Sequence, residues 1–276
     1  MPVQKDESGH RYVQAEVEVP GTPEEVWDAI ATGPGISSWF VPAQVDERVG
    51  GDVVCSFGPG MDSLATITEW DPPRRFIADS RDDMGPDDPT VATEWIVEAK
   101  AGGTCVVRVV HRWFTDSDAW DNQFEGHTYG WLSFFRVLRL YLAHFSGQHG
   151  TLVQVMGVAP PPKEEAWAAW TGPLGLAGAA VGQRVSTPAG APRLAGTVEW
   201  AGQPSWPEDL LIRLDEPAPG IAHLVPHPMG GQVYLTLRMY LYGDTAPAAA
   251  AQAEADWQAW MAGHFAPAEA PAAAEG

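Results

Sequence analysis

Basic residues are scarce in this 276-residue chain. It carries 16 Lys and Arg against 36 Asp and Glu, which gives a formal net charge of −20 at pH 7 with neutral histidines. Proteins hold a phosphate backbone or an anionic lipid surface through clustered Lys and Arg, and this composition offers no basic stripe. We therefore expect neither nucleic acid nor a membrane surface as a partner. The acidity favours solubility instead.

Cysteine and long apolar runs are scarce as well. The two cysteines, Cys55 and Cys105, lie in strand-like apolar stretches, where a reduced thiol behaves as a small buried hydrophobe. No run approaches the ~18 apolar residues of a membrane helix, and the opening MPVQKDESGHRY has no signal-peptide core. These features predict a soluble cytoplasmic protein. The excess of Arg over Lys, with abundant Ala, Gly and Pro, is typical of a GC-rich bacterial gene.

Motifs for metals and nucleotides are also missing. Cys55, Cys105, His111 and His127 lack the spacing of zinc ligands, and no P-loop or dinucleotide fingerprint occurs. The acidic stretch from Asp79 to Asp88 lacks the ligand register of a calcium loop, so a solvated hairpin tip is the favoured interpretation. We predict no metal and no cofactor.

What the sequence does contain is a long amphipathic helix. From Ser117 to Phe145 the bulky apolar residues recur in steps of three, four and seven, which places them along one helical face. Ser117 or Asp116 can cap its start, and Gly147 can end it. Such a helix spans on the order of 40 Å. It must therefore pack across a broad surface.

The segments before this helix predict a strand, two short helices and an antiparallel meander. A strand at 12–19 precedes a helix capped by Thr22, a break at Gly33-Pro34-Gly35 and a short helix ISSWF. Gly- and Pro-containing turns separate the strands that follow. We place these strands at residues 43–49, 52–57, 64–70, 75–80, 91–99 and 104–114.

Alternation assigns the two faces of the last two strands. One face of the final strand is apolar and inward, whereas Arg108 and Arg112 share the solvent face. On the strand before it, Thr93 and Trp95 point inward and Glu94 points outward. A curved sheet with such an inner face, wrapped on a long helix, tends to leave a cavity. The inward residues of the final strand are Cys105, Val107, Val109, His111 and Trp113.

Several motifs over roughly Tyr12 to Phe145 occur in the order found in one superfamily. They are ISSWF, TITEWDPPRRFI, GGTCVVRVVHRWF and the Gly130-Trp131 step into the long helix. In these motifs the chain resembles the START-like, SRPBCC superfamily, and within it the branch related to the activator of the ninety-kilodalton heat-shock protein ATPase. The resemblance implies a helix-grip fold around a hydrophobic pocket.

Beyond the glycine-rich FSGQHG the pattern begins again. Segments 151–158, 162–167, 197–200, 230–239 and 255–265 match, in order, successive parts of the first half. We therefore predict an α+β protein of two tandem helix-grip domains, each a curved antiparallel sheet wrapped around a long C-terminal helix. The domains are placed at 12–147 and 148–266, between a flexible lead-in (1–11) and a disordered tail (267–276).

The second copy is degenerate. Its loop at 181–194 is small and rich in Gly and Pro, and AGQPSWPEDL stands where the first copy has the DPPRR turn. Met239 replaces the inward His111. A second pocket lined by Leu235, Leu237 and Met239 is expected to be apolar or filled.

The inner surface of the first domain supplies the candidate ligand-binding residues. Tryptophans offer large contact areas for a flat or aromatic ligand, although filling the core is the alternative for each of them. His127 and Tyr129 can reach a pocket mouth or simply form a solvated first helical turn. The candidates are Trp39, Trp95, Val107, Val109, His111, Trp113, Trp131 and Phe135.

We expect a binder of a small hydrophobic ligand in domain 1, with domain 2 as scaffold or cap, rather than an enzyme. No nucleophile is placed to form a triad with His111. Two alternatives stay open. The superfamily contains cyclases, aromatases and hydrolases, which implies an enzyme using His111 as acid or base. The family name implies a regulator of a chaperone ATPase, which we rank last because the matched motifs are fold motifs.

Overall fold

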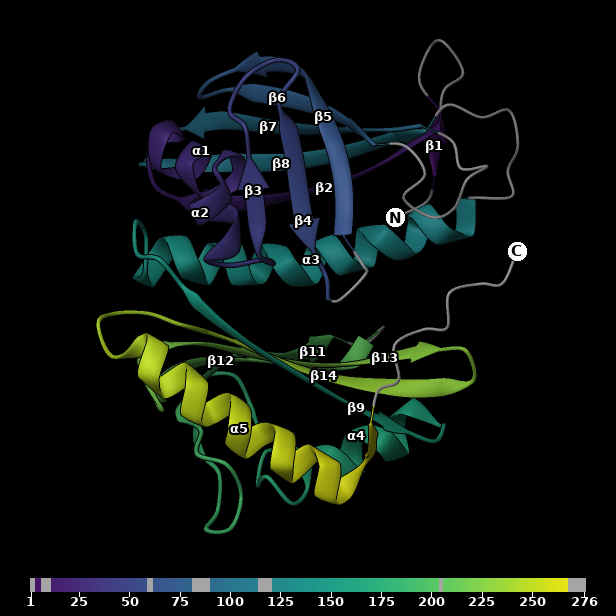
Figure 1. The fold of residues 1–276 in the computed structure, drawn as a ribbon, viewed down its shortest axis with the longest axis vertical. Helices are drawn as coiled ribbons and strands as arrows, with labels where there is room; N and C mark the ends of the chain where they lie inside the picture. The colour runs from purple at the N-terminus through teal and green to yellow at the C-terminus, as the bar shows by residue number, and fades with distance from the viewer. Residues whose placement is uncertain are drawn as a thin grey trace. The chain divides into compact units, whose positions relative to one another are not determined.

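The computed structural model describes residues 3–5, 11–58, 62–80, 90–113, 121–203 and 206–267, without the side chains of residues 121–129. The chain divides into two compact units, Met1–His149 and Gly150–Gly276. Each unit contains one antiparallel sheet followed by a long helix (Figure 1). None of the helices in the described part is both long and apolar enough to cross a membrane.

The described part of the first unit forms an eight-stranded sheet with three helices. The strand order is β1-β2-β8-β7-β6-β5-β4-β3. The elements are β1 (Gln4–Lys5), β2 (Arg11–Pro20), α1 (Pro23–Ala31), α2 (Gly33–Ser37), β3 (Ala43–Val45), β4 (Asp52–Ser56), β5 (Asp62–Asp71), β6 (Arg75–Ser80), β7 (Val91–Lys100), β8 (Thr104–Trp113) and α3 (Asp121–His144).

The second unit repeats this topology. Its strand order, β10-β11-β12-β13-β14-β9-β15, matches the run β4-β5-β6-β7-β8-β2 of the first sheet, with β15 added at the edge. The elements are β9 (Thr151–Ala159), α4 (Lys163–Thr171), β10 (Arg184–Ser186), β11 (Ala195–Gln203), β12 (Trp206–Glu216), β13 (Gly220–Met229), β14 (Gln232–Leu241), α5 (Ala246–His264) and β15 (Ala266–Pro267). The predicted fold class, two tandem α+β helix-grip domains, is confirmed.

Two details of the predicted elements were wrong. Gly33-Pro34-Gly35 does not separate two helices but opens α2, because the Thr32 hydroxyl accepts a hydrogen bond from the Gly35 N–H at 3.0 Å and caps the new helix. A Cβ at Gly35 would lie 1.9 Å from the Asp28 carbonyl oxygen, so the close approach of α1 and α2 requires glycine there. In the second unit, residues 201–203 of the supposed long turn belong to β11 and residues 206–210 belong to β12.

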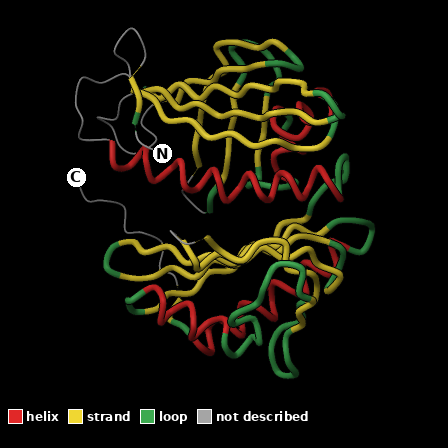
Figure 2. The backbone as a smooth tube through the Cα atoms, turned by 180° about the vertical axis from the view of Figure 1, so that it is seen from behind, coloured by secondary structure: helices red, strands yellow, loops and turns green. Residues whose placement is uncertain are grey.

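Helix α3 packs its apolar stripe on the first sheet, as the spacing of its residues predicts. It lies along one side of the sheet, next to β2 (Figures 1 and 2), and its inward residues are almost fully buried. The proposed caps Asp116 and Ser117 lie outside the described residues. The helix ends at His144, three residues before Gly147, whose φ of 75° suits glycine. The buried residues are Phe135, Val137, Leu138, Tyr141 and Leu142, with Phe145 just beyond the helix.

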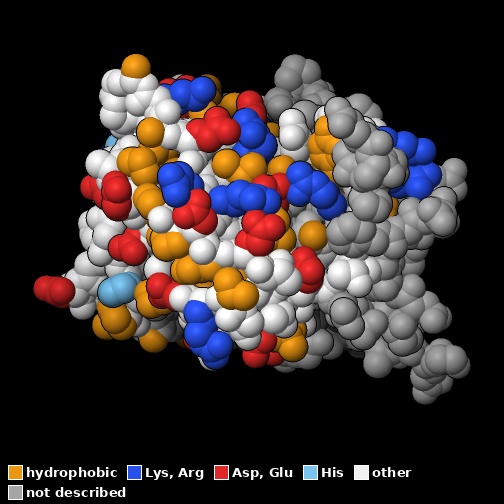
Figure 3. All heavy atoms as spheres, turned by 90° about the horizontal axis from the view of Figure 1, so that it is seen from above, with side chains coloured by type: hydrophobic (Ala, Val, Ile, Leu, Met, Phe, Trp, Pro, Cys, Tyr) orange, Lys and Arg blue, Asp and Glu red, His pale blue; other side chains and the backbone are white. Residues whose placement is uncertain are grey.

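The outer face of the first sheet is less uniformly solvated than predicted. Glu94 is only 5% exposed, and its carboxylate accepts hydrogen bonds from Arg75 and Arg112 at 2.5 Å each. Burial alone would raise the pKa of Glu94, but the hydrogen bonds and charges of Arg112 and Arg75 offset it, and the pKa lies below its usual value. On the face seen in Figure 3, basic and acidic side chains are likewise interspersed.

Helix α1 provides a test of the capping box. The Thr22 hydroxyl accepts from the Glu25 N–H at 3.3 Å, and the Glu25 carboxylate accepts from the Thr22 N–H at 2.8 Å. We expect Thr22→Ala to lower the free energy of unfolding by about 1 kcal/mol in urea denaturation. Thr245 precedes α5 without a side-chain cap, so Thr245→Ala is a matched control expected to change it by under ~0.5 kcal/mol. Equal effects would contradict the assignment.

Glu94 predicts a pH dependence of stability. Because its folded pKa lies below the unfolded value, the folded state binds fewer protons, and this stabilisation is present above pH ~4.5 and is lost as the pH falls through the folded pKa. We expect Glu94→Gln to cost about 1.5–3 kcal/mol at pH 7 and to flatten the loss below pH ~4.5. Urea denaturation from pH 7 to pH 3 measures both.

The matched control for this experiment is Glu98→Gln on the same face. Glu98 is an exposed partner of Arg108 at 3.4 Å, so its loss should cost under ~1 kcal/mol. If the two variants lose stability equally, the buried ion pair does not hold the outer face.

Candidate functional site

The inner face of the first sheet is built as the alternation predicts. Val107 and Val109 are 0% exposed, and Trp95 on β7 is 8% exposed. Strand β8 is paired along its whole length with β2 and β7, so its inward residues cannot shift. Cys105 is also buried here, and burial, with the charges of Glu24 and Glu25, raises the pKa of its thiol.

Four of the predicted residues come together between the sheet and α3. The ring of Trp131 lies edge-on to Trp95, with centroids 5.1 Å apart at 89°, and 5.7 Å from the ring of Phe135. It also stacks near His111 at 5.8 Å and 25°. The same ring stacks on Phe40 at 5.1 Å and 28°. We call Phe40, Trp95, His111, Trp131, Phe134 and Phe135 the Trp131 cluster.

His111 is the polar centre of the Trp131 cluster. The Trp131 indole N–H donates to His111 Nε2 at 2.6 Å, and His111 Nδ1 lies 2.9 Å from Thr93 Oγ1. An indole nitrogen can only donate, so Nε2 must be the acceptor. In the neutral ring Nδ1 then carries the proton and donates to Thr93. Both ring nitrogens are engaged, and the geometry selects the neutral imidazole.

Two other predicted tryptophans have structural positions instead. Trp39 is 1% exposed, and its indole N–H donates to the Ala29 carbonyl oxygen of α1 at 2.8 Å. Trp113 is 0% exposed and packs with Val13 and Val91 in a separate small cluster. Trp39 also contacts one member of the Trp131 cluster, Phe40, with ring centroids 5.6 Å apart.

Sequence reasoning missed Phe40, Phe76 and Phe134 as neighbours of the site. Phe40 adjoins Trp39 in the ISSWF motif, Phe134 adjoins Phe135 in α3, and Phe76 stacks on Trp95 at 6.3 Å. Phe57, which is 37% exposed, meets Phe40 edge-on at 5.7 Å. Through Phe57 and Phe40 a continuous path of aromatic contacts leads from the surface to Trp131.

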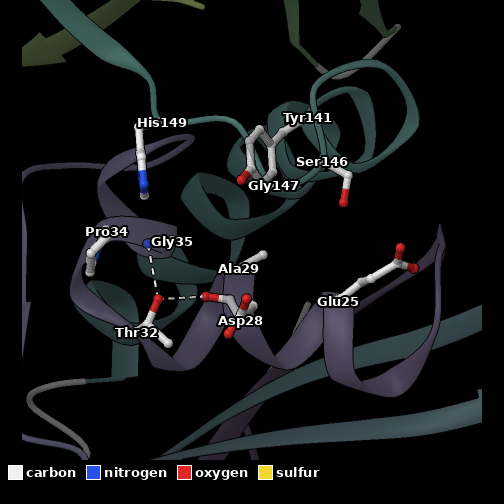
Figure 4. Close-up of a pocket in the computed structure, with 10 residues that line it drawn as sticks. All are labelled: Glu25, Asp28, Ala29, Thr32, Pro34, Gly35, Tyr141, Ser146, Gly147 and His149. Carbon is white, nitrogen blue, oxygen red and sulfur yellow. Dashed lines mark hydrogen bonds between the residues drawn. The ribbon is translucent and has the colours of Figure 1, made fainter.

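A pocket of about 190 Å³ lies elsewhere in the first unit. It is formed by α1, α2, the C-terminal end of α3 and the residues that follow α3 (Figure 4). Its lining mixes carboxylates, small residues, a tyrosine and a histidine, and includes none of the predicted site residues. Burial raises the pKa of Tyr141 in it. The lining residues are Glu25, Asp28, Ala29, Thr32, Pro34, Gly35, Tyr141, Ser146, Gly147 and His149.

Some sequence candidates lie beyond what the structure describes. Residues 81–88 of the acidic stretch are outside the described residues, and so are the side chains of His127 and Tyr129. Within the described ranges, no group of three or more His, Cys, Asp or Glu side chains is arranged to hold a metal ion.

The inner face of the second unit is filled by its own side chains. Leu235, Leu237 and Met239 are each 0% exposed and belong to one core with Trp170 and Trp257. Met239 occupies the strand position that His111 occupies in the first unit. The polar centre therefore exists only in the first of these two cores.

One known protein family matches the sequence of the first unit. The family described as "Activator of Hsp90 ATPase homolog 1-like protein" matches residues 20–143. This range runs from the end of β2 almost to the end of α3, so it contains every residue of the Trp131 cluster. No curated protein matches the sequence.

Solved structures with a similar fold cover either nearly all of this chain or about half of it. The di-domain ARO/CYC BexL from the BE-7585A biosynthetic pathway is 14% identical, with a TM-score of 0.45 over 94% of this chain and 100% of that one. DynU16 from the dynemicin biosynthetic locus is 18% identical, with a TM-score of 0.42 over 91% and 95%. The Aha1 dimer from Colwellia psychrerythraea is 17% identical, with a TM-score of 0.40 over 49% and 98%. Similarities of this size carry no functional information.

The hydrogen bonds of His111 predict its tautomer. We expect nitrogen-15 NMR of the imidazole at neutral pH to show a protonated Nδ1 and an unprotonated Nε2, because the Trp131 indole N–H needs an acceptor. In Trp131→Phe this constraint disappears, and the Nε2–H form should become populated. A protonated Nε2 in the unaltered protein would contradict the arrangement.

Proposed function

We propose that this chain, whose residues 20–143 form an activator of Hsp90 ATPase homolog 1-like domain, binds a small hydrophobic and aromatic molecule between the sheet and α3 of its first unit. The observation that carries the proposal is the Trp131 cluster, in which aromatic rings surround a single hydrogen-bonded polar pair. Ligand sites commonly combine apolar walls with a few placed polar groups.

The exposure of the Trp131 cluster supports binding over a purely structural core. Trp39 and Trp113, which have structural positions, are at most 1% exposed. Trp131, His111 and Phe134 instead keep part of their surface in solvent. A cluster that stays partly exposed can be reached from solvent by a flat molecule, which then stacks on the aromatic rings that line the site at little entropic cost.

The chemistry of this site favours binding over catalysis. His111 has both ring nitrogens hydrogen-bonded, so it offers no free base in this arrangement. Cys105 lies six residues away on the same strand, and burial raises the pKa of its thiol. A protonated thiol is a poor nucleophile. The residues described here therefore support recognition of a ligand rather than covalent attack on it.

In this proposal the second unit serves as a scaffold or cap. Its inner face repeats the strand geometry, but aliphatic side chains and Trp257 fill it, and Met239 cannot replace the hydrogen bonds of His111.

A titration with 2-naphthol tests the proposal. We expect saturable binding of one molecule per chain by isothermal titration calorimetry, and about tenfold weaker binding by Trp95→Ala, because Trp95 supplies one wall of the cluster. Trp260→Ala on α5 is the matched control, since it removes a partly buried tryptophan from the second unit. Non-saturable heats, or equal loss in both variants, would refute the proposed site.

A further inference from the structure

Trp131 occupies the place that a ligand of the proposed kind would take. Its ring has Phe40 and His111 nearly parallel to it, at 28° and 25°, and Trp95 perpendicular to it at 89°. These are the stacked and edge-on contacts that aromatic molecules prefer. The environment is therefore already complementary to a flat aromatic ring, and the ring present is the protein's own.

The polar group of Trp131 is matched in the same way. Its indole N–H is its single donor, and it donates to the unprotonated ring nitrogen of His111, Nε2, at 2.6 Å. Thr93 holds His111 from the other side at 2.9 Å and keeps the Nδ1 proton away from the ring of Trp131. The site thus offers an acceptor, and a molecule that brings an acceptor or a carboxylate would face a lone pair.

Trp131 also follows a residue that destabilises helix α3. Gly130 precedes it inside the helix, and a Cβ at that position would meet nothing within 4 Å. The glycine is thus not required by close packing, while glycine within a helix costs stability relative to alanine. Trp131 itself is partly exposed. A local change of the helix at this step would release the indole without moving the fully buried Phe135 and Leu138 further along.

We infer that Trp131 is a displaceable internal occupant of the first unit's site, and that the ligand displacing it is a flat aromatic molecule with one hydroxyl or N–H donor. That donor takes over the hydrogen bond to His111 Nε2. This inference rests on the proposed function and adds to it the ligand's polar group and the residue with which the ligand competes.

The first test follows the indole itself in the full chain. The Trp131 indole cross-peak in a proton–nitrogen-15 spectrum is assigned by its loss in Trp131→Phe. Saturation with 2-naphthol should move this peak away from its hydrogen-bonded position, toward that of an indole in water. An unmoved peak under saturating 2-naphthol overturns the inference while leaving the proposed function in place.

The second test removes the occupant. Calorimetry should show at least tenfold tighter binding of 2-naphthol by Trp131→Ala than by the unaltered protein, because the ligand no longer competes with the indole. Naphthalene, which lacks the donor, should bind Trp131→Ala about tenfold more weakly than 2-naphthol does. Adding His111→Phe should abolish this preference. Trp131→Leu serves the same purpose if the alanine variant does not fold.

Gly130→Ala gives an independent check. It should raise the melting temperature, because alanine favours the helix, and weaken 2-naphthol binding, because α3 then resists release of Trp131. Affinity of the Trp131 variants no higher than that of the unaltered protein, or no preference for 2-naphthol over naphthalene, overturns the inference. Absence of saturable 2-naphthol binding in every form removes the inference and the proposed function together.

Discussion

The pairing of β8 with both β2 and β7 is the constraint on which the rest of the first unit depends. Thr104–Trp113 is matched residue by residue to Arg11–Pro20 on one side and to Val91–Lys100 on the other. A slip of one residue would turn Val107, Val109 and His111 outward and bring arginines beneath α3. Two flanking strands make such a slip costly, so backbone hydrogen bonds determine which face of the sheet carries His111.

Much of this arrangement could be predicted from the sequence, because it follows from short-range rules. Alternation identified the inner face, and the spacing of apolar residues identified α3. The partnership of His111 with Thr93 was within reach, since the turn at 101–103 sets the register that places these residues opposite each other. The burial of Glu94 depends on the register of β6 against β7, which brings Arg75 to its carboxylate, and the alternation of residues does not set that register. The hydrogen bond between Trp131 and His111 depends on the position of α3 on the sheet, and the periodicity of apolar residues does not encode that position.

The two units share one topology but differ in the side chains of their inner faces. In both, a strand-turn-strand pair presents its inward residues to a C-terminal helix, and the corresponding strands follow in the same order. In the first unit this face carries His111, whose two hydrogen bonds require specific partners. In the second it carries Met239 within an aliphatic core, where shape alone decides the packing. At this position the two faces therefore differ in kind, because the first carries a hydrogen-bonding side chain and the second an apolar one.

An internal occupant also resolves a physical difficulty of apolar binding sites. An empty apolar cavity large enough for a two-ring molecule, ~150 Å³, would cost about 3–4 kcal/mol of stability, a large share of what a domain possesses. Filling it with Trp131 removes that cost and satisfies His111 at the same time. In the displacement that we propose, the ligand competes with the indole, because it must replace both the ring contacts and the hydrogen bond that the indole already makes. Molecules without a donor would leave His111 Nε2 unpaired and would be disfavoured, so on this proposal Trp131 both fills the site of the free protein and sets its selectivity.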